Sequence, residues 1–176
     1  MSIGNSQDER DREALSKFTL EQPVCHPMYG LGTVETIEEK EVLGERISLA
    51  QIYFPRENMK MMVNVDKETE LFRPLIEEEQ VDAVFEHMKN HEGRFPSRAN
   101  QRQRINMDKI KSNDIFQLGE VIKDLHVMST KKKLSFKESE MLERARQVMI
   151  EELTMVTGRK SETLDELIAR ACLSIN

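Results

Sequence analysis

The feature that most constrains the fold of this chain is a change in the spacing of its apolar residues near Pro74. Before Pro74, apolar residues alternate with polar ones in short runs separated by Gly and Pro, a pattern typical of strands joined by tight turns. After it, apolar residues recur every three or four positions, as in amphipathic helices. We therefore expect an α+β fold, with a β domain over residues 18–75 and a helical domain over residues 76–176.

The β domain is expected to contain four or five short antiparallel strands. The sequence favours strands at residues 21–27, 33–41, 45–54 and 59–65. Because an open sheet of this size exposes its edge strands, we predict a small antiparallel barrel that closes on itself. Residues 1–17 are mostly polar and charged and are expected to form a flexible tail.

The helical domain is expected to contain five helices. Their approximate limits are residues 77–90, 97–111, 115–128, 135–156 and 161–172. Ser135 and Glu138 form an S-x-x-E capping box at the start of the fourth helix, and Gly158 is placed to end it.

Charge is distributed unevenly along the chain. The net charge is −6, which by itself argues against binding to nucleic acid. Residues 87–146, however, hold 14 basic and 8 acidic residues, a net of +6, and the rest of the chain carries −12. Such a basic segment is either a solvated helical face or a surface that binds phosphates, and composition leaves both open.

No set of residues has the spacing of an active site or a metal site. His87 and His91 are four residues apart, but no further His or Cys lies nearby in sequence to complete a metal site. Cys25 and Cys172 match no metal or redox motif, which favours a reduced, cytoplasmic location. We therefore expect no enzymatic activity, no cofactor and no small-molecule substrate. No apolar run is long enough to cross a membrane.

The expected helix at 97–111 carries a cationic stripe. On an ideal helix, Arg98, Arg102 and Lys109 lie within about 40° of one another. The opposite arc holds Ala99, Met107 and Ile110. Arg94 precedes this helix, and Arg104 flanks the stripe. The stripe suits contacts with phosphates, although a solvated face explains the same pattern.

Six short segments, three in each domain, form a recognisable set of motifs. The β domain has H-P-M-Y-G-L-G-T-V at residues 26–34, F-P-R-E-N-M-K-M-M-V at 54–63 and L-F-R-P at 71–74. The helical domain has K-S-N-D-I at 111–115, L-S at 134–135 and A-R-Q-V-M-I-E-E-L at 145–153. These segments span about residues 20–158, and in their order and spacing they resemble the CarD/CdnL family of bacterial transcription regulators.

The resemblance implies a Tudor-like β domain that is shared with the transcription-repair coupling factor and binds the β subunit of RNA polymerase. Family positions that contact the polymerase fall at Lys40, where the charge is kept, and at Met62, where some members have Arg. Arg56 and Lys60 lie on or beside the adjacent turn and are candidates to supply that cation.

The resemblance also implies that the helical domain contacts promoter DNA at the upstream edge of the melted region, weakly and mainly through phosphates. The candidate DNA-binding residues are Arg94, Arg98, Ala99, Arg102, Arg104, Lys137 and Ser139. Ala99 falls where the family commonly has a Trp that wedges the minor groove, and a methyl group cannot do this. Ser139 falls at a basic position of the family, with Lys137 two residues away.

The sequence thus predicts a cytoplasmic transcription regulator that binds polymerase and promoter DNA and tunes the stability of the open complex. The alternative is an adaptor that binds polymerase or another protein without wedging DNA. The two hypotheses differ in what the helical domain does at the promoter.

Overall fold

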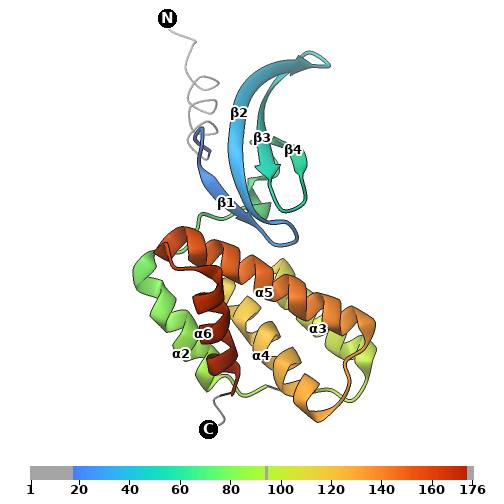
Figure 1. Ribbon diagram of the computed structural model, residues 1–176. Coiled ribbons are helices and arrows are strands. Elements are labelled where there is room, and N and C mark those ends of the chain that lie inside the picture. The colour runs from blue at the N-terminus through green and yellow to red at the C-terminus, as the bar shows by residue number, and fades with distance from the viewer. Residues whose placement is uncertain (1–17, 94, 174–176) are drawn as a thin grey trace, which may run out of the picture. The chain divides into compact units, whose positions relative to one another are not determined.

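The computed structural model describes residues 18–93 and 95–173. The chain divides into two compact units, with the boundary between Pro74 and Leu75. The described strands all lie in the first unit and the described α-helices all lie in the second (Figure 1). The predicted α+β fold, strands first and helices second, is therefore confirmed.

The described part of the β unit is a four-stranded antiparallel sheet that curls on itself (Figure 1). Along the sheet lie β1 (Pro23–His26), β2 (Gly30–Val42), β3 (Glu45–Phe54) and β4 (Met59–Asn64), in that order. Ala50, Ile52 and Phe54 alternate along β3, are fully buried and fill the inner face. The outer edge of β1 is closed by Arg73, which exchanges two backbone hydrogen bonds with Cys25 (2.9 and 3.1 Å).

The hairpin formed by β2 and β3 extends beyond the other strands (Figure 1). Val42 pairs with Glu45, so Leu43 and Gly44 form a two-residue turn. Both have positive φ (54° and 81°), as a type I′ turn requires. Leu43 is fully exposed, so the hairpin ends in an apolar side chain on a strained backbone.

Five α-helices make up the described part of the second unit. They are α2 (Val81–Asn90), α3 (Ala99–Lys111), α4 (Ile115–Lys131), α5 (Phe136–Thr157) and α6 (Ser161–Leu173). A short 3₁₀ helix, η2 (Glu78–Gln80), precedes α2, and another, η1 (Thr69–Leu71), follows β4 in the first unit. The central helix is α4, which contacts each of the other four and buries one apolar face along its whole length. None of the described helices is both long and apolar enough to span a membrane.

The helix boundaries follow the signals in the sequence. The Asp114 side chain caps α4 by accepting a hydrogen bond from the Phe116 backbone N–H at 2.8 Å. Ser135 and Glu138 form the predicted capping box at the start of α5. Gly158 ends α5 with a φ of 66°.

One prediction about α3 is wrong. The buried residues of this helix are Arg102 and Asn106, and Lys109 is half-buried, so part of the cationic stripe faces the neighbouring helices. Ala99, from the expected apolar arc, is exposed. The reason is that α3 has too few apolar residues for a continuous apolar face, and charged groups on neighbouring helices pair with its inner side chains instead.

Candidate functional site

Three of the four candidate polymerase-binding residues share one face of the sheet. Lys40, Lys60 and Met62 are paired across the ladders with odd-numbered residues of β3. The even-numbered residues Ala50 and Ile52 point into the core, so the odd-numbered residues and their partners lie on the outer face. The fourth residue, Arg56, lies in the turn between β3 and β4, with its Nε 3.4 Å from a carboxylate oxygen of Glu57.

This outer face has an exposed apolar side chain and two lysines. Met62 is 46 % exposed. Lys40 lies 3.2 Å from the carboxylate of Glu38, and Lys60 lies 2.8 Å from that of Glu35. The hydrogen bond from Lys60 lowers the pKa of the Glu35 carboxyl. Both lysines therefore project from the sheet in ion pairs that a partner can exchange for its own carboxylates.

Strand β4 forms an edge of the sheet. It pairs with β3 on one side, and the described residues supply no strand on its other side. An edge of this kind presents backbone N–H and C=O groups to which a strand of another chain can bind. Because Lys60 and Met62 lie on β4, their side chains flank this edge.

In the helical unit, Arg102 links the start of α3 to the start of α5. Its Nε and Nη2 lie 2.9 and 2.8 Å from Oε1 of Glu138, and its Nη1 donates to the carbonyl oxygens of Pro96 and Ser97 at 2.8 and 2.7 Å. Oε2 of Glu138 accepts hydrogen bonds from the backbone N–H and the hydroxyl of Ser135. The side chains of Arg102 and Glu138 are only 5 % and 2 % exposed.

This arrangement shows where one of the candidate DNA-binding residues, Arg102, lies. Burial alone would raise the pKa of the Glu138 carboxyl, but hydrogen bonds from Ser135 and Arg102 and the charge of Arg102 outweigh it and hold the pKa below its ordinary value. Glu138 is therefore ionised at neutral pH, and Arg102 is its counter-ion. In this structure the guanidinium of Arg102 is buried against Glu138, so it links the starts of α3 and α5 and is not exposed at the surface.

The Arg102 link brings together candidate residues that are about 40 positions apart in the sequence. Arg98 and Ala99 begin α3, whereas Lys137 and Ser139 lie in the first turn of α5, and all four are exposed. Both segments contact the Arg102–Glu138 ion pair: Arg102 donates to the carbonyl oxygen of Ser97, and Glu138 accepts a hydrogen bond from the Ser135 hydroxyl.

The two remaining candidate cations are Arg104 and Arg94. Arg104 is exposed and is two residues beyond Arg102, which places it on nearly the opposite side of α3. Arg94 lies outside the described residues. Within residues 18–93 and 95–173, no carboxylate forms an ion pair with Arg98, Arg104 or Lys137. These three cations are therefore available to bind phosphates.

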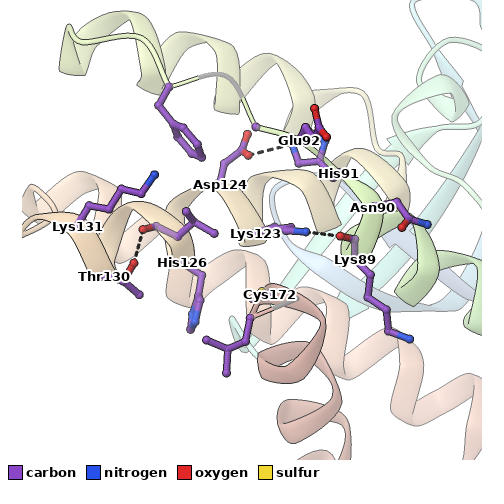
Figure 2. Close-up of a pocket in the computed structure, with 14 residues that line it drawn as sticks. Lys89, Asn90, His91, Glu92, Lys123, Asp124, His126, Thr130, Lys131 and Cys172 are labelled. Atoms are coloured by element: carbon purple, nitrogen blue, oxygen red, sulfur yellow. Dashed lines mark hydrogen bonds and ion pairs between the residues drawn. The ribbon is translucent and has the colours of Figure 1, made fainter. Parts of the chain in front are cut away.

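A second charged network joins α2, α3 and α4. Lys109 lies 2.9 Å from Glu120 and 3.4 Å from Asp124, while His87 and His91 contact the same two carboxylates at 2.8 and 2.9 Å (Figure 2 shows the His91–Asp124 contact). Burial would raise the pKa of Glu120, but hydrogen bonds from Lys109 and His87 and the Lys109 charge outweigh it and lower the pKa. The two histidines thus contact carboxylates, and no group of three or more His, Cys, Asp or Glu side chains among the described residues is arranged to hold a metal ion.

A pocket of about 240 Å³ lies beside this network, against α4 and the end of α6 (Figure 2). Among its charged groups, Lys123 donates to the carbonyl oxygen of Lys89, and Asp124 contacts His91. Burial raises the pKa of the Cys172 thiol to about 11, although nearby cations act in the opposite direction. The thiol is therefore protonated at neutral pH, and the pocket holds no activated nucleophile at this residue.

The exposed side chain of Phe136 is not predicted from the sequence. It is the first residue of α5 and is 83 % exposed. The periodicity of apolar residues gives no signal for such a position, because the first residue of a helix can face either way. Phe95, which is 39 % exposed, precedes α3, and the carbonyl oxygen of the next residue, Pro96, accepts a hydrogen bond from Arg102.

Comparison with known proteins bears on both units. The CarD-like/TRCF RID domain matches residues 18–76, and the CarD C-terminal domain matches residues 83–169. YdeB of Bacillus subtilis (strain 168), a candidate transcription factor, is 32 % identical over 145 residues, which are 80 % of this chain and 93 % of YdeB. The chain belongs to the CarD-like family. The resemblance noted in the sequence motifs is therefore confirmed, and the family is one of transcription regulators, not of enzymes.

Several CarD-like motif residues in the β unit have clear structural roles. His26 begins the first motif, and its Nδ1 accepts a hydrogen bond from the Met28 backbone N–H at 3.1 Å, which fixes the turn between β1 and β2. Phe54 begins the second motif and is fully buried. Asn58 ends the turn of that motif with a φ of 46°, a conformation that Asn tolerates well. Some residues of the CarD-like motifs therefore stabilise turns and the core of the β unit and do not identify residues that contact a partner.

Proposed function

We propose that this chain is a cytoplasmic transcription regulator that binds the RNA polymerase β subunit through its β unit. Its helical unit contacts promoter DNA near the upstream edge of the open complex, and the two contacts together tune the stability of that complex. The observation that carries the proposal is the match of both units, in order, to the two domains of the CarD-like family.

The geometry of the β unit supports the polymerase contact. Met62 and Lys40 lie opposite Gln51 and Ile47, which are four residues apart on β3, or about 13 Å along the strand. Lys60 is two residues from Met62 on the same face. A partner strand that adds to the β4 edge is bound by backbone hydrogen bonds, while these side chains read its sequence.

The geometry of the helical unit supports a contact that is mainly with phosphates. Arg98 and Lys137 project from two helix starts that the buried Arg102–Glu138 pair holds together, and Arg104 adds a third exposed cation. A few phosphate contacts of this kind give weak binding that falls steeply with salt and tolerates many sequences. In a complex with promoter DNA, the polymerase supplies most of the affinity.

Capture of the polymerase β subunit by the full chain tests the first contact. Met62→Glu and Lys40→Glu place acidic groups on the outer face and should each weaken capture at least several-fold. Lys67→Glu is the matched control, because Lys67 is exposed in the turn after β4 and lies outside the strand ladders. Equal capture by all variants would contradict the proposed surface.

Charge reversal in the helical unit tests the second contact. The double variant Arg98→Glu/Arg104→Glu should abolish salt-sensitive DNA binding. The control Arg159→Glu/Lys160→Glu makes the same change in net charge at exposed residues between α5 and α6. If both double variants weaken binding equally, the effect reflects net charge and not a defined surface.

One observation favours a second candidate, an adaptor that binds polymerase without wedging DNA. Ala99 is exposed at the start of α3, and its methyl group is too small to separate base pairs. The two candidates are distinguished by Ala99→Trp. This variant should lengthen the lifetime of the open complex if the helical unit lies at the minor groove, and should leave it unchanged if the chain is only an adaptor.

A further inference from the structure

Phe136 is the most exposed aromatic side chain among the described residues. At 83 % exposed, its ring contributes almost nothing to either apolar core. Neighbouring residues nevertheless hold its backbone in place: Ser135 and Glu138 form the capping box on either side of it, and Arg102 anchors Glu138. An exposed ring on a fixed backbone loses little conformational entropy when it binds a partner.

Lysines surround this ring in the sequence. Lys131, Lys132 and Lys133 precede it at the end of α4, and Lys137 follows it, all four exposed. Within the described parts of the chain, none of these lysines pairs with a carboxylate. Of the acidic residues that follow within about one turn, Glu138 is neutralised by Arg102 and Glu140 is exposed. The four lysines outnumber these carboxylates, so the ring lies in a net positive environment.

A second ring extends this surface. Lys131 Nζ lies 5.3 Å from the centre of the Phe95 ring. Phe95, Lys131 and Lys132 also line a pocket of about 210 Å³ together with Pro96, Ser97 and Met128. In Figure 1 the α4–α5 loop and the start of α3 lie at the same end of the helical unit, as the Arg102 contacts require. Aromatic and cationic side chains from three segments thus share this end.

We propose that Phe136 is a stacking site for an unpaired DNA base, with Lys131–Lys133 and Lys137 binding the phosphates on either side. The partner must carry regularly spaced negative charge to match the lysines and a flat apolar face to match the ring, and unpaired nucleotides supply both. In an intact duplex the base faces are hidden by stacking, so the site should prefer DNA that is locally unpaired. This inference rests on the proposed contact between the helical unit and promoter DNA, and it names the form of DNA that is bound.

The chain has no tryptophan, which makes a direct test available. In the full chain, Phe136→Trp supplies a single indole whose fluorescence an adjacent base quenches on stacking. The matched control is Met155→Trp, an exposed position on the same helix 19 residues further on, about 28 Å away. We expect quenching of the indole at position 136 by a duplex with a central run of unpaired thymines, little quenching by the fully paired duplex, and none at position 155.

Affinity provides the second measurement. Phe136→Ala should weaken binding to the partly unpaired duplex roughly 5- to 100-fold and leave binding to the paired duplex almost unchanged. Because the ring is exposed, the variant should unfold at the same temperature as the parent chain, which circular dichroism checks.

Three results would overturn the inference. If Phe136→Ala loses affinity equally for paired and unpaired DNA, Phe136 does not recognise unpaired bases. The proposed contact between the helical unit and DNA then stands, and the stacking site does not. Quenching by an acidic peptide, with none by unpaired DNA, identifies the surface as a protein-binding site. Absence of binding to either DNA at low salt removes both the stacking site and the proposed DNA contact.

Discussion

Replacing Arg102 with Met removes the charge that neutralises Glu138 inside the helical unit. The Glu138 side chain is 2 % exposed, and it loses the contacts at 2.9 and 2.8 Å from the guanidinium, while the carbonyl oxygens of Pro96 and Ser97 lose their donor. Leaving one member of a buried ion pair without its partner costs about 3–5 kcal/mol. We expect Arg102→Met to lower the free energy of unfolding of the helical unit by that amount.

The double variant Arg102→Met/Glu138→Met distinguishes the cost of an unpaired buried charge from the cost of losing the other contacts of these two side chains. Replacing both charges with apolar groups of similar size removes the unpaired charge. The remaining cost, about 1–2 kcal/mol, is the lost Glu138 half of the capping box and the lost donor to the carbonyl oxygens of Pro96 and Ser97. Urea titrations followed by circular dichroism should therefore show the double variant to be more stable than Arg102→Met. If Arg102→Met lies within about 1 kcal/mol of the parent chain and loses DNA affinity as Arg98→Glu does, Arg102 is an exposed phosphate contact and our account of it is wrong.

Three further predictions concern stability. Leu43→Asn should raise the free energy of unfolding of the β unit by about 1 kcal/mol, because Asn tolerates the positive φ of the hairpin turn better than Leu, and urea titration measures this. Gly158→Ala should lower the free energy of unfolding of the helical unit by about 1 kcal/mol, because Ala tolerates the positive φ at this position less well than Gly. A lower melting temperature would show this. The folded chain holds the pKa values of Glu120 and Glu138 below their ordinary values. Their stabilisation is complete above the unfolded-state pKa and is lost as the pH falls through the lowered folded values, so thermal melts in acid should show this loss and Glu120→Gln should reduce it.

The fold could be predicted from local signals because these signals agree with one another. The apolar residues Ile47, Leu49 and Ile52 in a short run bounded by Gly44 and Pro55 predict the strand at 45–54, which is β3 in the structure. The Ser135–Glu138 capping box marked the start of α5 equally well. Such signals depend on neighbours within four or five residues, so tertiary contacts do not override them.

The candidate site could be predicted only in part, because it depends on contacts between distant segments. A helical wheel gives the relative positions of residues on α3 but not which side faces the other helices. The partner that buries Arg102 is Glu138, 36 residues later, and no local pattern predicts that pairing. The placement of Lys40, Lys60 and Met62 on one outer face depends on the register of two ladders and could be stated only once that register was known.

Whether both units act on the open complex is measured by the lifetime of the complex that RNA polymerase forms at a promoter, after addition of a competitor that traps free polymerase. The parent chain should change this lifetime, and both Met62→Glu, in the β unit, and Arg98→Glu/Arg104→Glu, in the helical unit, should reduce the change. Lys67→Glu should behave as the parent chain. An unchanged lifetime with the parent chain, or a full effect with Met62→Glu, would contradict the account.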